Sequence, residues 1–142
     1  MELLAESQDS IKIKLTSTNT SRTDTLLFYT PTEESFCVTV ISIDLIEVGT
    51  NKEHSYFPCT EIADLDHILL NKTNSVLIPP SDSFSFDLSL DKKRISPHLK
   101  KGRYRMKASL YYGYGNFKLE SATKYTVYRG TKASNDVSIN VK

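Results

Sequence analysis

The segment from Arg103 to Tyr112 places apolar and polar side chains in alternation, and it constrains the fold more than any other part of the sequence. A period of two residues is typical of an extended strand, in which successive side chains point to opposite faces of a sheet. One face of this strand is therefore expected to be apolar and buried, and the other basic and exposed. The apolar residues are Tyr104, Met106, Ala108, Leu110 and Tyr112.

The segment 83–90 alternates in the same way, with Phe84, Phe86, Leu88 and Leu90 on its apolar side. We expect these two strands to belong to one antiparallel system. A sheet with one apolar face must bury that face against another layer, and the sequence has no long segment of helical periodicity to provide it. A second sheet is therefore the expected cover.

Further strand-like segments, separated by turn residues, extend along the chain. The sequence therefore predicts an all-β fold, an immunoglobulin-like antiparallel β-sandwich of about eight strands. Residues 1–10 are a polar leader in this interpretation, and residues 11–142 form a single sandwich domain. The remaining strands are expected at 11–19, 25–29, 36–48, 54–57, 76–78, 117–128 and 135–142.

Three segments carry a more specific expectation. Residues 36–48 form the longest apolar run, and their β-branched residues favour a strand over a helix. In residues 61–70 a short helix competes with an irregular connection. Residues 112–116, which contain two glycines, are expected to form the tip of a hairpin.

The composition places few limits on where the protein works. The chain of 142 residues is 39% hydrophobic, enough to bury a core without a metal or a disulfide framework. It has no run of about 18 apolar residues, so no membrane-spanning helix is predicted. Its first nine residues carry acids and no apolar core, unlike a signal peptide. The compartment stays open, because a secreted chain trimmed of its signal would have the same sequence.

Charge is segregated along the chain although the net charge is only +1. Residues 1–91 hold 5 Lys and Arg against 15 Asp and Glu, a net of −10, and residues 92–142 hold 13 against 2, a net of +11. The favoured interpretation is that strands of the two halves interleave, for example with Asp87 across from Arg103 or Arg105. The alternative is a domain with an acidic and a basic side, which would favour head-to-tail association or an acidic partner.

Two cysteines, Cys37 and Cys59, are equally compatible with one disulfide and with two buried thiols. Metal-binding and catalytic motifs are absent from the sequence. Asp64, Asp66 and His67 are better explained as a solvated acidic loop than as a metal site, since no glycine-defined calcium loop accompanies them. The sequence therefore predicts a non-enzymatic protein without a metal or a cofactor.

Two loops are the candidates for contact with a protein partner, because proline or glycine makes them rigid and they carry aromatic side chains. The first runs from Tyr29 to Glu34 and the second from Tyr111 to Phe117. An alternative for the second loop is that Tyr112 and Phe117 belong to the core. The predicted partner-binding residues are Tyr29, Pro31, Glu33, Glu34, Tyr111, Tyr114 and Phe117.

A basic and aromatic strip on the outward side of the strands is the alternative binding surface. Such a strip can hold carbohydrate, or single-stranded nucleic acid through stacking and phosphate contacts. Nucleic acid is the less favoured ligand, because a basic strip is more often an exposed sheet face paired with acids. The strip consists of Arg103, Arg105, Lys107, Lys124 and Tyr128.

Five short pieces within residues 11–112 carry a resemblance to a known family: Thr18-Asn19-Thr20, Leu26 to Glu34, Val48-Gly49 followed by Tyr56, Phe86 to Ser89, and Gly102 to Tyr104. Together they resemble the N-terminal β-sandwich pro-domain of deuterolysin-type metallopeptidases and their bacterial relatives. Thr32 stands where that family has leucine, Phe57-Pro58 replaces a glycine, and the catalytic domain is missing. The resemblance implies a stand-alone pro-domain-like sandwich, a proteinase inhibitor or peptidase-associated protein, which would be secreted.

Overall fold

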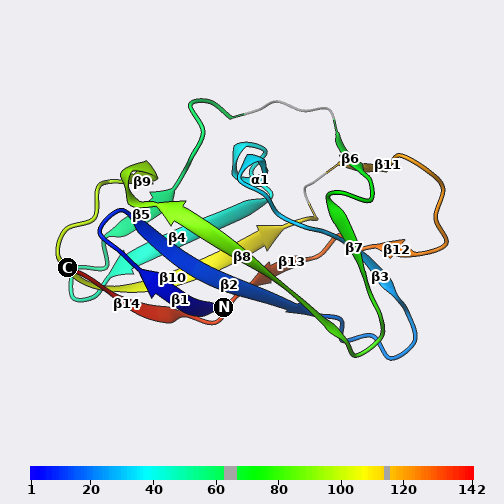
Figure 1. Cartoon of the computed structure of the whole chain (residues 1–142), viewed down its shortest axis with the longest axis horizontal. Helices are drawn as coiled ribbons and strands as arrows, with labels where there is room; N and C mark the ends of the chain where they lie inside the picture. Colours follow the sequence, from blue (N-terminus) through cyan, green and yellow to red (C-terminus); the bar gives the residue numbers. More distant parts are fainter. Residues whose placement is uncertain (63–66, 114–115) are drawn as a thin grey trace.

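Two sheets that face each other form the body of the molecule (Figure 1). The computed structural model describes residues 1–62, 67–113 and 116–142. One sheet is antiparallel and has the order β1-β2-β8, formed by Glu2–Glu6, Ser10–Thr18 and Ser83–Asp91. The other has the order β13-β10-β4-β5-β9, with β14 also on β10. Its strands are Thr131–Ala133, Gly102–Tyr111, Ile41–Glu47, Glu53–Tyr56, Ile95–Ser96 and Val137–Val141.

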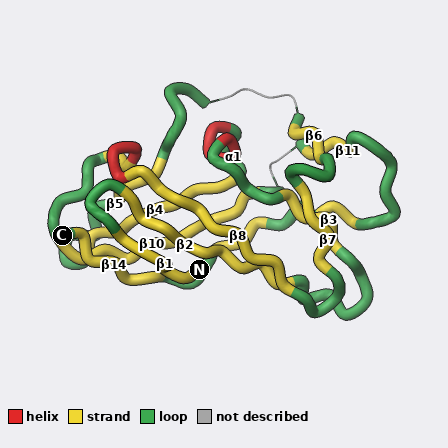
Figure 2. Tube along the Cα trace, in the orientation of Figure 1, coloured by secondary structure: helices red, strands yellow, loops and turns green. Residues whose placement is uncertain are grey.

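Two small sheets extend the sandwich at the end away from the C-terminus (Figure 1). Strand β3 (Leu26–Tyr29) pairs with β7 (Ser75–Ile78) and with β12 (Thr126–Val127), and β6 (Ile68–Leu70) pairs with β11 (Phe117–Leu119). The pairs β3–β12 and β6–β11 are parallel. Among the described residues, helical structure is limited to α1 (Glu34–Cys37) and the 3-10 turn η1 (Lys92–Arg94), as Figure 2 shows.

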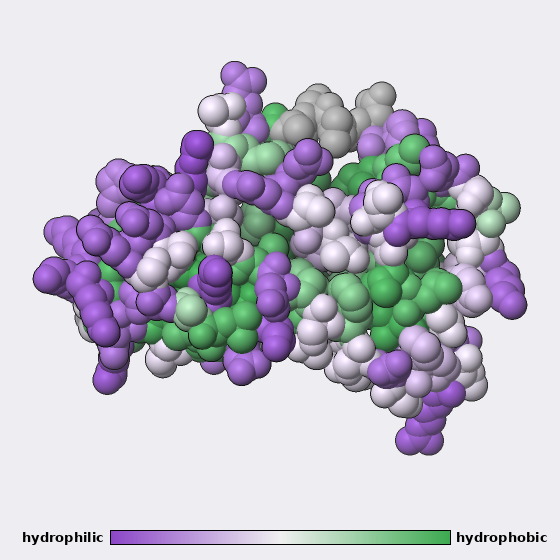
Figure 3. All heavy atoms as spheres, in the orientation of Figure 1, coloured by the Kyte–Doolittle hydropathy of each residue, from purple (hydrophilic) through white to green (hydrophobic). Residues whose placement is uncertain are grey.

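The core lies between the two larger sheets, where alternate residues of β2, β4 and β10 point inward. Burying each of these aliphatic or aromatic side chains contributes about 1.5–3 kcal/mol. Apolar residues also gather on the visible surface over β3 and β7, whereas polar residues cover the opposite end (Figure 3). The buried residues of the three strands are Ile11, Ile13, Leu15, Ile41, Ile43, Leu45, Tyr104, Met106, Ala108 and Leu110.

The all-β sandwich and the alternation of the two opening strands are confirmed. Residues 103–112 alternate between exposed or half-buried and buried positions. Residues 83–90 alternate between exposed and half-buried positions, and the last apolar residue, Leu90, is buried. Their expected pairing in one system is wrong, because β8 pairs with β2 whereas β10 pairs with β4, β13 and β14. The two strands belong to opposite layers of the sandwich.

Residues 2–6 form β1 and pair with Ile11–Lys14 of β2, so the predicted leader belongs to the sheet. The predicted strand over 36–48 begins only at Ile41, because residues 34–37 form α1. This helix starts where the Ser35 hydroxyl accepts a hydrogen bond from the Thr32 N–H (2.7 Å), and its buried Phe36 ring packs on Tyr56. Burial of Phe36 therefore outweighs the β propensity of the neighbouring residues.

The expected hairpin around 112–116 is not formed, because β11 pairs with β6 in parallel. Residues 114–115 lie outside the described part of the chain, as do residues 63–66 of the acidic segment. Of the predicted connection over 61–70, residues 68–70 form β6. The chain thus uses more and shorter strands than the pattern predicts.

The two oppositely charged halves interleave, as the favoured interpretation expected. Lys107 of β10 stands across from Asp44 of β4, and the Lys92 ammonium lies 2.7 Å from the Glu6 carboxylate. The particular pairing of Asp87 with an arginine is wrong, because Lys14 of β2 lies opposite it. Pairing strands from both halves therefore spreads charges of both signs over the sheets.

Candidate functional site

The predicted loop from Tyr29 to Glu34 has a buried base and an exposed end. Tyr29 and Pro31 are buried, and the Tyr29 hydroxyl is hydrogen-bonded to the Ser35 hydroxyl at 2.8 Å. Glu33 and Glu34 are exposed at the start of α1. The loop therefore exposes its two carboxylates to solvent, whereas Tyr29 is part of the core.

An aromatic cluster at the end of the sandwich contains two of the four aromatic residues predicted to bind a partner, Tyr29 and Phe117. Neighbouring rings in this cluster have centroids 5.3–6.0 Å apart. Phe117 is 4% exposed, so the core alternative is correct for it and the binding prediction is wrong. Burial raises the pKa of the Tyr112 and Tyr128 hydroxyls. The cluster consists of Phe28, Tyr29, Tyr112, Phe117 and Tyr128.

Of the other two residues predicted in that loop, Tyr111 is half-buried at the end of β10. Tyr114 lies outside the described residues. The predicted second loop is therefore not assembled as a binding surface in the described part of the chain.

A cavity of about 270 Å³ lies between the start of α1 and β8. Pro31 and Glu33 line it from the predicted loop, and Asp87 and Leu88 line it from β8. Its wall includes Tyr56, whose pKa is raised by burial and, next, by the Glu33 carboxylate. We define the β8 site as this cavity together with the edge of β8 that faces away from β2.

Sequence reasoning found Pro31 and Glu33 but missed the other members of the β8 site. The sequence pattern shows Asp87 only as a polar position of the alternating segment 83–90, and Tyr56 only as a residue of the strand expected over 54–57. The missing signal was long-range, because α1, β5 and β8 are brought together by the packing of the two sheets. The alternation of residues 83–90 shows which face of β8 is polar, but not that the strand lies at an edge.

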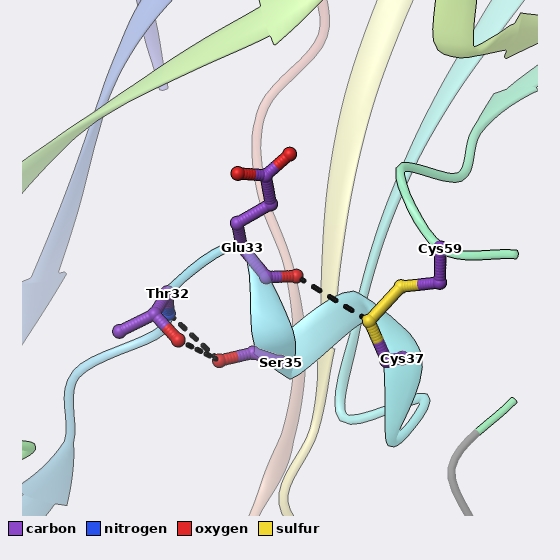
Figure 4. Close-up of a disulfide and its surroundings, with 5 residues drawn as sticks. All are labelled: Thr32, Glu33, Ser35, Cys37 and Cys59. Atoms are coloured by element: carbon purple, nitrogen blue, oxygen red, sulfur yellow. Dashed lines mark hydrogen bonds between the residues drawn. A yellow bond between two sulfur atoms is a disulfide. The ribbon is translucent and has the colours of Figure 1, made fainter.

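A disulfide joins Cys37 of α1 to Cys59, with Cα atoms 5.6 Å apart, which settles the alternative left open by the sequence (Figure 4). The bond attaches the short helix to the chain that follows β5. The Glu33 side chain extends away from the disulfide in Figure 4. The covalent link thus anchors the helix that carries one wall of the β8 site.

The predicted basic strip is not continuous. Arg103, Arg105 and Lys107 share the outer face of β10, but Asp136 lies 3.6 Å from the Arg105 guanidinium. Lys124 lies in the connection before β12, where its ammonium contacts the Tyr125 ring. Tyr128 follows β12 and packs in the aromatic cluster. The five residues therefore do not form one surface for stacking and phosphate contacts.

Within residues 1–62, 67–113 and 116–142, no group of three His, Cys, Asp or Glu side chains is arranged to hold a metal ion. Asp64 and Asp66 of the acidic segment lie outside this part of the chain. The described residues also include no helix long and apolar enough to cross a membrane.

Comparisons of the chain with protein-family models, with curated proteins and with solved structures gave no match. The resemblance to deuterolysin-type pro-domains therefore stays a prediction.

Proposed function

We propose that this protein is an interaction module that binds an extended segment of a partner protein as an added strand on the edge of β8. The observation that carries the proposal is the regularity of this edge. β8 pairs with β2 over nine consecutive residues without a bulge, and no described strand pairs with its other side. Long regular edges present unpaired N–H and C=O groups that an incoming strand can use.

The direction of the backbone groups supports this use of the edge. The Ser10 carbonyl accepts a hydrogen bond from the Ser7 N–H (2.9 Å), so it points toward β1. The pair Ser10–Asp91 is therefore a non-hydrogen-bonded pair, and so is every second pair along the β2–β8 ladder. The N–H and C=O groups of Ser85, Asp87 and Ser89 consequently point away from β2, toward the open edge.

The apolar face of β8 offers area for an added strand to cover. Phe84, Phe86 and Leu88 are only half-buried, and the two phenylalanine rings stack with centroids 6.1 Å apart. The adjacent cavity can receive one side chain of the incoming segment. Backbone hydrogen bonds would give the pairing its register, and the cavity would give it specificity.

Asp87 disfavours pairing of the edge with a second copy of itself. It is the central residue of β8, so full antiparallel pairing of two β8 strands places the two Asp87 carboxylates opposite each other. Like charges directly opposite destabilise a sheet. A partner segment with a basic residue opposite Asp87 avoids this repulsion, as Lys14 of β2 does within the fold.

The test uses a synthetic peptide with the sequence of β2, Ser-Ile-Lys-Ile-Lys-Leu-Thr-Ser-Thr, because β2 is the strand that β8 already pairs with. We expect saturable binding in calorimetry. A peptide with glutamate at both lysine positions should bind three- to tenfold more weakly, and Asp87→Lys should reverse this order. Absence of binding by the β2 peptide at millimolar concentration would overturn the proposal.

Two substitutions at one position separate edge pairing from a general surface contact. Ser89→Pro removes the N–H that points to the open edge, without removing a bond to β2. Ser89→Ala keeps that N–H and serves as the matched control. We expect Ser89→Pro to abolish peptide binding and Ser89→Ala to retain it, with both variants folded by circular dichroism. Binding unchanged in a folded Ser89→Pro would locate the contact elsewhere.

A peptidase is the finer candidate for the partner, and this part of the proposal rests on the resemblance to pro-domains. Peptidases hold polypeptides in extended form, which suits an edge strand. Capture of one zinc peptidase from the source organism's extract by the wild type, and its loss with Ser89→Pro, would support it. If no peptidase is captured while the β2 peptide still binds, the protein is an interaction module without a peptidase partner.

A further inference from the structure

A second hollow lies on the side of the sandwich away from β8, beyond the region where the edge strands β1 and β14 contact each other. β1 covers β2 only as far as Lys14, so the backbone groups of Thr16 and Thr18 face an open space. On the opposite layer β13 follows β14 along the edge of β10, and among the described strands it pairs with β10 alone. We call the space between these two edges the β2–β13 groove.

Two adjoining cavities, of about 350 and 270 Å³, make up the groove. They share Ser17, Thr18, Thr20 and Lys132 in their linings. Leu26, Phe28 and Ile78 form the apolar wall of the larger cavity, and Tyr128 closes it. Sites for small molecules have volumes of about 300–1,000 Å³, an apolar lining and a few polar groups that orient the ligand.

The charge of the groove points to the class of ligand. Among the described residues that line the two cavities, Lys132 has the one ionised side chain, and no Asp or Glu is present. Its ammonium lies 5.7 Å from the centre of the Tyr128 ring, beside the larger cavity. A cation next to an apolar wall with hydroxyl groups at its rim is complementary to a carboxylate that carries an apolar chain.

We propose that the β2–β13 groove binds a small amphipathic carboxylate, with its apolar chain in the larger cavity and its carboxylate at the Lys132 ammonium. The hydroxyls of Ser17 and Thr20 supply further donors at the junction of the two cavities, whereas the Thr18 hydroxyl is hydrogen-bonded to the Ser83 hydroxyl of β8 at 2.8 Å. The site is separate from the β8 site, with which it shares no lining residue. The inference therefore stands whether or not β8 binds a peptide.

The experiment titrates the full chain with decanoate, below its micellar concentration, and with decylammonium, which has the same chain and the opposite charge. Binding is followed by calorimetry and by the NMR shifts of backbone amides. We expect decanoate to bind and to shift the amides of Thr18, Tyr128 and Lys132. Decylammonium should bind at least threefold more weakly. Absence of decanoate binding, or equal binding of the two probes, would overturn the proposal.

Lys132→Met removes the ammonium and keeps an apolar side chain, so it tests the charge without opening the groove. Because Lys132 is exposed, we expect its loss to weaken decanoate binding about three- to tenfold. Lys124→Met, which removes a lysine outside the groove, is the matched control and should bind as the wild type does. Decanoate binding that is equal in Lys132→Met and the wild type would refute the assigned role of the lysine.

Discussion

The Tyr112 hydroxyl donates a hydrogen bond of 2.7 Å to the backbone carbonyl oxygen of Tyr29, which connects residues 83 positions apart. Tyr112 is fully buried where β10 ends, and Tyr29 ends β3, so the bond links the large sheet to the small one. The rings of the two tyrosines also meet edge to face, with centroids 5.7 Å apart. This contact fixes the aromatic cluster between the body of the sandwich and its end.

Tyr112→Phe should lower the free energy of unfolding by about 1–2 kcal/mol, because it leaves the buried Tyr29 carbonyl without this donor and changes little else. Urea unfolding followed by circular dichroism measures the loss. Tyr125→Phe, a half-buried tyrosine in the connection before β12, is the control and should change stability by less than about 0.5 kcal/mol. Equal effects of the two substitutions would contradict the role of the bond.

The protein should lose stability at alkaline pH through the buried tyrosines. Burial raises the pKa of Tyr112 above the value of about 10 that it has in the unfolded chain. The folded state therefore keeps a proton that the unfolded state releases, so this contribution is complete below pH 10 and decreases as the pH rises further. Urea unfolding between pH 8 and 11 should show a steeper decrease for the wild type than for Tyr112→Phe. Parallel curves would exclude Tyr112 as the cause.

Removing the disulfide with Cys37→Ser and Cys59→Ser should lower the free energy of unfolding by about 3 kcal/mol, since the bond closes a loop with a sequence separation of 22. The wild type in dithiothreitol should approach the stability of the double variant, and the double variant should not respond to the reductant. Thermal unfolding with and without dithiothreitol gives the comparison. The prediction would be contradicted if the wild type, with its two thiols verified as reduced, unfolded at the same temperature as the oxidised protein.

Asn19→Asp should destabilise the fold by about 3 kcal/mol or more, because it puts a charge at a position that is 1% exposed. The Asn19 side-chain nitrogen donates to the carbonyl oxygens of Asp24 (2.7 Å) and Ile78 (2.9 Å). A carboxylate has no hydrogen to donate to either oxygen. Denaturant unfolding is the measurement, and Asn140→Asp on the exposed face of β14 is the matched control with an expected change of less than about 0.5 kcal/mol. A similar loss of unfolding free energy in both variants would show that the hydrogen bonds of the buried Asn19 amide are not the cause.

The alternating segments determined the fold class and the faces of the main strands. In residues 11–18, 83–90 and 103–112, the apolar positions face the core as the sequence predicts, because side chains of an extended backbone alternate whatever the strand pairs with. The loop that contains Pro31 and Glu33 could also be selected as a candidate contact loop, because its proline and its aromatic side chain are local signals in the sequence. The face of each strand and the candidate loop can be predicted because they depend only on residues that are close together in the sequence.

Only the tertiary structure decided which strands pair, which aromatics are buried and where the candidate sites lie. The patterns of β8 and β10 are alike, yet they occupy opposite layers, because pairing depends on contacts between distant segments. Phe117 is buried because β3 and β10 pack around it, and Cys37 meets Cys59 because α1 packs beside the chain after β5. The edge of β8 and the β2–β13 groove lie where no described strand pairs with the exposed backbone. The sequence pattern of a strand does not show which segment lies beside it.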